Sequence, residues 1–490
     1  MSKVLFVTAP YFCWGVQVIG TWPPLLMAYL AGVTLETGNQ AVIYDAMNKK
    51  HSFDDVKKEI ARHQPDIVVT LDYLPVTGAI STATVPAALQ VLALAKEVNP
   101  SIVTLLGGPH PTFMYEEILQ DENNPVDFIF CGEPELILKE LLQALPQGKG
   151  KAVKGVAYRE GASVIANQRQ PHILELDRLQ PAWHLLDWND YVYQVEPQGT
   201  MASILTSRGC DMGCAFCSQR LFWRDDWRCR KPEKVVEEME HLIENYGVSY
   251  FTLIDPYPTK HRDRWEAYLD LLIERNLGVR LLIETRVEDI IRDADILDKY
   301  RAAGIFHIYL GAESGDDQVL DALNKGTDFA MNKRAVDLLR EAGIMTEASF
   351  MIGLPQESWD SIEKTIEAAV ELNPDIAVFP VFTPFPFTPI YQEVQERIRV
   401  YDYAKYNLVT PIIEPDRMSM PEITDALGLC YMRFYGKKVQ EVLQWEEGPM
   451  KSYMLSAFRL MMRDYGEQFD FAGSEAPPGH PSIAATGSSY

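Results

Sequence analysis

Three cysteines stand within eight residues in the stretch RGCDMGCAFC, which spans residues 208–217. Their spacing is C-x3-C-x2-C, and a predicted strand over residues 203–207 comes directly before them. Thiolates are soft ligands that suit iron–sulfur clusters, and the glycines of the loop let the backbone fold around a cluster. Three thiolates on one loop can each hold one iron of a cubane and leave the fourth iron open. We therefore predict a 4Fe–4S cluster on Cys210, Cys214 and Cys217.

Two other interpretations of the cysteine triplet stay open at this point. Structural zinc normally takes four protein ligands, commonly as two separated pairs, and three unpaired thiols would need no partner. Cys229 is the candidate fourth ligand, but it lies in the segment WRDDWRC of residues 223–229, which has no glycine-rich turn. The cluster interpretation predicts that Cys229 is not a ligand.

The sequence around the triplet, residues 199–390, alternates short apolar runs with long helical patterns. A complete eight-unit barrel needs about 250 residues, and its active-site groups stand where strands end. Six units in fewer residues predict an open, partial (β/α)6 barrel. Its expected strands cover residues 203–207, 250–254, 280–284, 306–310, 347–352 and 376–380.

Three of these strands end in polar or glycine-containing segments. They are ETR at residues 284–286, GAESG at 311–315 and MIGLP at 351–355. A carboxylate such as Glu313 can accept hydrogen bonds from hydroxyl groups, and a guanidinium such as Arg286 can bind a carboxylate. Taken singly, either residue would more often form a salt bridge at the barrel rim.

The triplet and the three strand ends together resemble the radical S-adenosylmethionine (SAM) superfamily. In that superfamily the open iron chelates the amino and carboxylate groups of SAM. The resemblance implies that SAM is bound by Glu284, Arg286, Glu313, Ser314 and Gly353.

Residues 1–145 form the N-terminal domain and predict a doubly wound parallel sheet, because five apolar runs alternate with helical patterns. Ligands of such sheets bind at the carboxyl ends of the strands. Two strands lead into LGGPHPT at residues 106–112 and CGEPE at 131–135. These segments resemble the cobalamin-binding domain of the methylating radical SAM class. The implied cobalamin contacts are Tyr73, Leu74, Gly107, Gly108, His110, Gly132 and Glu133.

A motif that many cobalamin domains carry is missing from this sequence. It is D-x-H-x-x-G, whose histidine coordinates cobalt from below. We therefore expect cobalt without a histidine beneath it, facing the loop of residues 71–77. His110 is then a contact to the corrin or a structural histidine.

The rest of the chain and its composition set further bounds. Residues 146–198 predict a hairpin and a linker, and residues 391–490 a mostly helical C-terminal region that ends in a flexible tail. The formal charge of −24 argues against nucleic acid as a partner. Prolines and glycines interrupt the uncharged run of residues 4–35, so we expect no integral membrane segment and a cytoplasmic location.

Several segments resemble the anaerobic magnesium-protoporphyrin monomethyl ester cyclase group in particular. They are GTWPP at residues 20–24, CSQ at 217–219, FWR at 222–224 and YNLVTPI at 406–412. The sequence departs from that group at TAPYFCW, residues 8–14, and at DPYP, residues 255–258, where an acidic pair is expected.

We predict a cobalamin-dependent radical SAM methylase that acts on an unactivated carbon and needs an external electron donor. Tyr257 is the candidate catalytic residue, expected near the path of the radical. The first alternative is cyclase-type tetrapyrrole oxidation, and the second is a corrinoid and iron–sulfur carrier or sensor without turnover. The substrate stays open among a tetrapyrrole, a lipid and a protein side chain.

Overall fold

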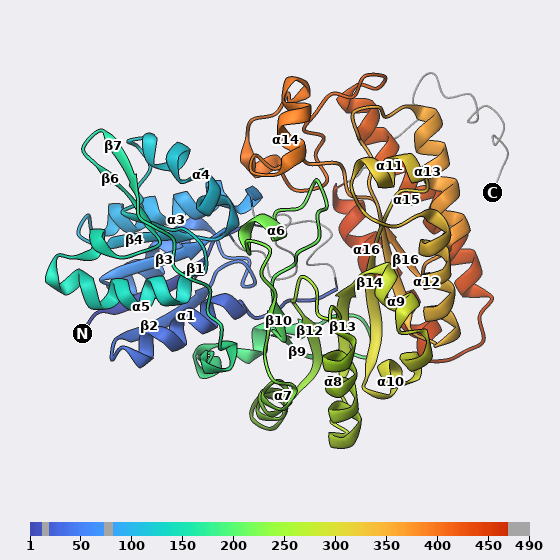
Figure 1. Cartoon of the computed structure of the whole chain (residues 1–490), viewed down its shortest axis with the longest axis horizontal. Coiled ribbons are helices and arrows are strands. Elements are labelled where there is room, and N and C mark those ends of the chain that lie inside the picture. The colour runs from blue at the N-terminus through green and yellow to red at the C-terminus, as the bar shows by residue number, and fades with distance from the viewer. Residues whose placement is uncertain (12–18, 73–81, 469–490) are drawn as a thin grey trace.

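Two mostly parallel β-sheets, each covered by helices, make up most of the chain in a computed structural model that describes residues 1–11, 19–72 and 82–468 (Figure 1). The first sheet belongs to the N-terminal unit and the second forms the partial barrel. The predicted α/β class, with a doubly wound N-terminal domain, a partial barrel and a mostly helical C-terminal region, is confirmed.

The first sheet has the strand order β2-β1-β3-β4-β5-β6-β7, in which β1 to β5 run parallel. Its strands are β1 (Lys3–Thr8), β2 (Gln40–Asp45), β3 (Ile67–Leu71), β4 (Val103–Gly107), β5 (Phe128–Phe130), β6 (Val156–Glu160) and β7 (Ser163–Ala166). Its helices are α1 (Leu25–Glu36), α2 (Phe53–His63), α3 (Val85–Val98), α4 (Pro109–Gln120) and α5 (Pro134–Ala144). The hairpin expected after residue 145 is β6–β7, and it extends this sheet because β6 pairs antiparallel with β5.

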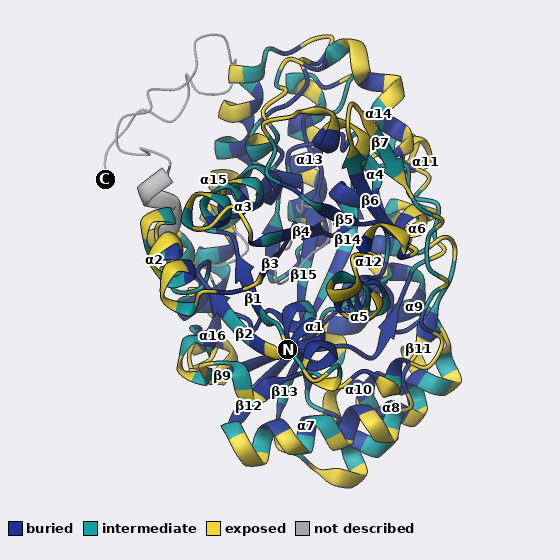
Figure 2. Cartoon of the chain, turned by 90° about the vertical axis from the view of Figure 1, so that its left-hand side faces the viewer, coloured by how far each residue is buried: buried dark blue, intermediate teal, exposed yellow. Residues whose placement is uncertain are grey.

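Helix α1 explains the uncharged N-terminal run, because it packs on both units at once. Met27 and Leu30 belong to the core beneath the first sheet. Ala28, Tyr29 and Val33 join the core of the barrel. With both faces covered, a charged side chain on this helix would lose its hydration without a partner. Figure 2 shows the strands of both sheets buried beneath more exposed helices.

The second sheet has the order β16-β15-β14-β13-β12-β9-β8 and curls into the partial barrel. Its six parallel strands are β9 (Gly199–Ile204), β12 (Val248–Leu253), β13 (Arg280–Thr285), β14 (Ile305–Glu313), β15 (Met345–Phe350) and β16 (Ile376–Val378), and β8 (Val192–Tyr193) pairs antiparallel with β9. The helices along it are α6 (Gln219–Phe222), α7 (Pro232–Tyr246), α8 (Arg262–Arg275), α9 (Val287–Arg292), α10 (Leu297–Ala302), α11 (Asp317–Ala322), α12 (Phe329–Glu341) and α13 (Trp359–Leu372). The six predicted strands are thus all present.

Three helices complete the C-terminal region, namely α14 (Pro389–Val394), α15 (Met420–Leu443) and α16 (Pro449–Gln468). Helix α15 begins at a capping box between Ser419 and Glu422 and covers the open side of the barrel sheet. The tail predicted over residues 472–490 lies outside the described residues. Within the described ranges, no helix has both the length and the apolar composition that a membrane span requires.

Candidate functional site

The cysteine loop leaves the barrel through a short two-stranded ribbon. Strand β10 (Ser207–Arg208) pairs antiparallel with β11 (Arg228–Cys229), which places Cys229 opposite Ser207. Cys210, Cys214 and Cys217 are partly buried, whereas Cys229 is exposed. The structure therefore brings the three triplet thiols to one place and leaves Cys229 apart from the cavity that they line.

A cavity of about 330 Å³ lies where the cysteine loop faces the N-terminal unit. From the N-terminal unit it is lined by Leu25, Leu26, Tyr29, Asp72, Gly108, Pro109 and Pro134. From the barrel it is lined by the three cysteines together with Arg208, Phe216, Phe222, Trp223, Asp255, Glu284, Arg286, Tyr309, Glu313 and Lys325, among others. The carboxyl ends of both sheets thus contribute to one hollow, as expected for ligand sites of such sheets.

The donor set fits an iron–sulfur cluster better than a single metal ion. Among the described residues, no three histidine, cysteine or acidic side chains converge as ligands of one ion. A cubane does not need such convergence, because each thiolate binds a different iron. Burial raises the pKa of Cys217 to about 12, so its thiolate form requires a compensating cation such as iron.

The SAM-binding candidates Glu284 and Arg286 stand at the end of β13 and line the cavity. Burial, with a smaller effect of the Glu347 carboxylate, raises the pKa of Glu284 to about 8. Arg286 is held by Glu288 and by the carbonyl of Lys325, and its Nη1 lies 3.9 Å from Sγ of Cys214. The guanidinium is therefore positioned beside the cluster loop.

Glu313 reaches the cavity through a distortion of β14. The register between β14 and β15 shifts between Gly311 and Glu313, and Glu313 adopts a φ of 60°. Bulges of this kind re-aim side chains next to active sites. The carboxylate accepts hydrogen bonds from Nζ of Lys325 at 2.8 Å and from Oγ of Ser349 at 3.2 Å.

The other two SAM candidates are not among the residues that line the cavity. Oγ of Ser314 accepts a hydrogen bond from the backbone N–H of Asp316 at 3.0 Å. The N–H of Gly353 donates to Oε2 of Glu357 at 2.8 Å. Both residues thus make local hydrogen bonds within the strand-end loops.

Among the cavity residues that sequence reasoning missed are Tyr29, Tyr309 and Lys325. Tyr309 is the β14 partner of Glu284 on β13, so strand pairing brings it to the same face. The only sequence signal for Tyr309 is therefore its place in a predicted barrel strand. Lys325 belongs to none of the strand-end motifs, and Tyr29 comes from the helix between the two units.

The predicted cobalamin contacts include two glycines with left-handed backbone conformations. Gly108 has a φ of 114°, and a Cβ there would lie 1.5 Å from Oδ1 of Asp72. Gly132 has a φ of 115°, and no atom lies within 4 Å of its Cβ position. Gly107 ends β4 against the side chains of Leu71 and Phe130. The open space at Gly132 fits the close approach of a large ligand such as a corrin.

Of the remaining cobalamin candidates, Tyr73 and Leu74 lie outside the described residues. His110 is fully buried, and burial lowers its pKa to about 3. Its Nδ1 lies 3.2 Å from Oγ1 of Thr82, and its ring packs edge-on against Tyr403, with ring centroids 4.8 Å apart.

Glu133 faces the barrel, with its carboxylate bound to three donors. Arg208 and Arg228 donate from the β10–β11 ribbon at 2.9 and 2.8 Å, and the backbone N–H of Ile173 donates at 2.9 Å. Burial favours the neutral acid, yet the two guanidiniums hold the pKa of Glu133 below its usual range. These bonds leave less of the carboxylate available for the cobalamin contact that the sequence predicts.

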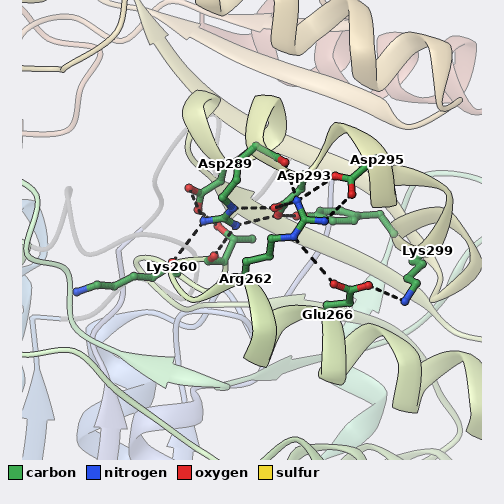
Figure 3. Close-up of polar contacts among 10 residues, drawn as sticks. Lys260, Arg262, Glu266, Asp289, Asp293, Asp295 and Lys299 are labelled. Atoms are coloured by element: carbon green, nitrogen blue, oxygen red, sulfur yellow. Dashed lines mark hydrogen bonds and ion pairs between the residues drawn. The ribbon is translucent and has the colours of Figure 1, made fainter.

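Tyr257, the catalytic candidate, is buried and is not among the residues that line the cavity. Its hydroxyl donates to Oδ1 of Asp289 at 3.3 Å. Asp289 also pairs with Arg292 at 3.0 Å. Figure 3 shows Asp289 in the ion-pair network of the outer helices, which includes Arg262 and Asp293. The phenol is thus anchored to the barrel wall.

A cubane-type thiol loop at the mouth of a partial barrel, facing a doubly wound domain across a shared cavity, defines a cobalamin-binding radical SAM protein. Comparison with known proteins agrees with that class. The model of the Radical SAM superfamily matches residues 204–369, and that of the B12 binding domain matches residues 14–142.

Comparison with individual relatives shows to which family within this class the chain belongs. The chain is 40% identical over 479 residues to the anaerobic magnesium-protoporphyrin IX monomethyl ester cyclase of Rubrivivax gelatinosus, covering 95% of this chain and 84% of that protein. It is 29% identical over 440 residues to an uncharacterized methyltransferase of Pyrococcus horikoshii, covering 89% and 93%. The chain belongs to the family of cobalamin-binding radical SAM enzymes of the methylase and cyclase type. Its cofactors are a 4Fe–4S cluster, SAM and cobalamin.

A solved structure of the same fold is the radical SAM methyltransferase TsrM from Kitasatospora setae with cobalamin and a 4Fe–4S cluster bound. It superposes with a TM-score of 0.69 at 16% identity and covers 96% of this chain and all of that chain. The likeness supports the predicted two-domain architecture.

Proposed function

We propose that this enzyme transfers a methyl group to an unactivated carbon of a substrate held between SAM and cobalamin. The observation that carries the proposal is the shared cavity, which is lined by the triplet cysteines and Glu284 on one side and by Gly108 and Pro134 on the other. When bound, the cluster and SAM supply a 5′-deoxyadenosyl radical, and methylcobalamin supplies the methyl group. A substrate in this cavity would lie against both.

The charged residues of the cavity have separate roles in this proposal. Arg286, held in place by Glu288, would bind the carboxylate of SAM beside the cluster loop. Glu313 and Lys325 form a buried ion pair that keeps both side chains oriented. Glu284 has no hydrogen-bond partner among the described residues, so its carboxyl group is available to a hydroxyl or amino group of SAM.

The apolar residues of the cavity would exclude water from the radical. Leu25, Leu26 and Tyr29 come from α1, and Phe222 and Trp223 come from the segment after the cysteine loop. A dry, enclosed site prevents side reactions of a reactive intermediate. The two units together provide this enclosure, since neither supplies all of these residues.

Cyclase-type oxidation of a tetrapyrrole is the second candidate, and the 40% identity to a named cyclase over nearly the whole chain favours it. Two departures from the cyclase pattern favour methylation instead. Residues 8–14 differ in sequence, and residues 12–14 among them lie outside the described part of the structure. At the second departure, Asp255 is bound by Thr206 and Ser207 and is therefore committed to the loop.

One labelling experiment separates the candidates. Enzyme, reductant, methylcobalamin and methyl-labelled SAM are incubated anaerobically with a candidate tetrapyrrole, lipid or peptide. Label in the product, with deoxyadenosine and S-adenosylhomocysteine near one to one, supports methylation. Conversion of magnesium-protoporphyrin monomethyl ester to the ring-closed product without label transfer would establish the cyclase reaction and refute ours. Absence of deoxyadenosine with every substrate would favour a carrier or sensor.

A further inference from the structure

Four charged side chains are buried together between the cobalamin-binding unit and the cysteine loop. Glu133 and Glu135 come from the start of α5, and Arg208 and Arg228 come from the β10–β11 ribbon. Their side chains are at most 5% exposed. We call these four residues the interdomain ion cluster.

The β10–β11 ribbon requires acidic partners from the other unit. Arg208 and Arg228 are direct partners in the antiparallel pairing of the ribbon, and like charges in directly opposed positions destabilise such a pair. Glu133 bridges both guanidiniums, and Glu135 accepts from Nη2 of Arg208 at 2.6 Å. Without Glu133, the two buried arginines would face each other with Glu135 beside Arg208 and the partly exposed Asp226, 3.2 Å from Arg228, as their acidic partners.

Each end of the ion cluster is close in sequence to a cofactor site. Arg208 stands two residues before Cys210, the first ligand of the iron–sulfur cluster. Glu133 directly follows Gly132, whose Cβ position faces open space, and directly precedes Pro134, which lines the cavity. A ligand that fixes the loop of residues 131–134 would therefore also fix the Arg208 guanidinium, which donates to Glu133.

We infer that Glu133 is a positioning residue that couples cobalamin binding to the assembly of the iron–sulfur cluster through Arg208 and Arg228. Coupling between two sites is reciprocal, so the presence of either cofactor strengthens binding of the other by the same factor. The role goes beyond the proposed methyl transfer, because it concerns cofactor loading and holds for a methylase or a cyclase.

A thermodynamic cycle tests the coupling without any substrate. Cobalamin affinity is measured anaerobically, by equilibrium titration followed by absorbance, for the cluster-loaded protein and for a cluster-free variant in which Cys210, Cys214 and Cys217 are alanine. We expect loss of the cluster to weaken cobalamin binding about tenfold, within the usual range of coupling between sites. In the Glu133→Gln background the same loss of the cluster should change the affinity by less than about twofold.

This ratio distinguishes positioning from a purely structural role. A structural Glu133 would lower both affinities equally and leave the ratio as in the wild type. Glu238→Gln is the matched control, because Glu238 on α7 is an acidic partner of another buried arginine, Arg230, which also pairs with Asp177 and not with the residues of the Gly132 loop. Its ratio should stay near ten.

Arg208→Lys provides a second test if Glu133→Gln does not fold. Lysine keeps the positive charge but cannot bridge Glu133 and Glu135 with a planar fork, so the ratio should again fall toward one. An unchanged ratio in Glu133→Gln or in Arg208→Lys, or a ratio of one in the wild type, would overturn the inference.

Discussion

At the scale of single residues, the cysteines separate the cluster interpretation from its alternatives. Cys210→Ala, Cys214→Ala or Cys217→Ala should each abolish the cluster, because each removes the ligand of one iron. Cys229→Ala should leave about four irons per chain, since Cys229 is exposed and stands apart from the cavity. Iron and sulfide analysis of anaerobically purified protein measures this. Equal loss of iron in Cys229→Ala would refute the open-iron arrangement.

Two glycines with nearly the same φ give a matched pair of substitutions. Gly108→Ala would drive a Cβ to 1.5 Å from Oδ1 of Asp72, and we expect it to cost roughly 2–4 kcal/mol of unfolding free energy. Gly132→Ala meets no atom within 4 Å, so backbone strain of about 1–2 kcal/mol remains. Urea unfolding followed by circular dichroism compares the two. The structure is contradicted if Gly132→Ala is the more destabilising.

Gly132→Ala should weaken the affinity for cobalamin, although it should destabilise the fold less than Gly108→Ala does. A methyl group placed in the open space at residue 132 would stand where we expect the corrin. Cobalamin affinity close to that of the wild type would place the corrin elsewhere.

Glu284 predicts a pH dependence of stability in the cofactor-free protein. Burial, and then the Glu347 carboxylate, raises the pKa of Glu284 from 4.5, the ordinary value of a glutamate, to about 8 in the folded chain. Between these values the folded state binds more protons than the unfolded state, so stability falls as pH rises, by up to about 1.4 kcal/mol per pH unit. Glu284→Gln should remove this slope. Parallel curves of unfolding free energy against pH for both proteins would show that Glu284 titrates normally.

At the scale of elements, helix α15 protects the edge of the barrel sheet. The hydroxyl of Tyr435 accepts from the N–H of Ala377 at 3.2 Å and donates to its carbonyl at 2.8 Å, and that of Tyr431 accepts from the N–H of Phe379 at 3.2 Å. These contacts satisfy backbone groups at and beside β16 that no further strand pairs. A helix thus closes the side where the barrel is incomplete.

Removal of one hydroxyl tests this edge protection. Tyr435→Phe should cost about 1–3 kcal/mol, the usual penalty for buried polar groups left without a partner. Amide exchange at Ala377 should accelerate. Tyr401→Phe, at a tyrosine that is 70% exposed, should change neither quantity. Unchanged exchange at Ala377 in Tyr435→Phe would mean that the edge is protected in another way.

Sequence patterns predicted these elements better than the contacts between them. The strands of both sheets and the triplet loop follow from local apolar runs and spacing. The bridge from Glu133 to Arg208 joins residues far apart in the sequence, so the local pattern CGEPE does not indicate it. The distortion that turns Glu313 toward Lys325 depends on the pairing of β14 with β15, which no local pattern specifies.

At the scale of the whole molecule, the two units share cores and a cavity. Helix α1 contributes to both cores, and the cavity takes its walls from both sheets. Neither unit could therefore present its cofactor to a substrate alone. The proposed methyl transfer requires the iron–sulfur cluster and cobalamin to stand on opposite sides of one cavity.

The magnetic interaction between the two cofactors tests that requirement most directly. The protein is loaded with both, the cluster is reduced and cobalamin is brought to the Co(II) form, and pulsed electron paramagnetic resonance measures the dipolar coupling between the two spins. We predict a strong coupling that disappears in the variant with alanine at Cys210, Cys214 and Cys217. Two independent spectra that simply add in the fully loaded protein would contradict the shared cavity.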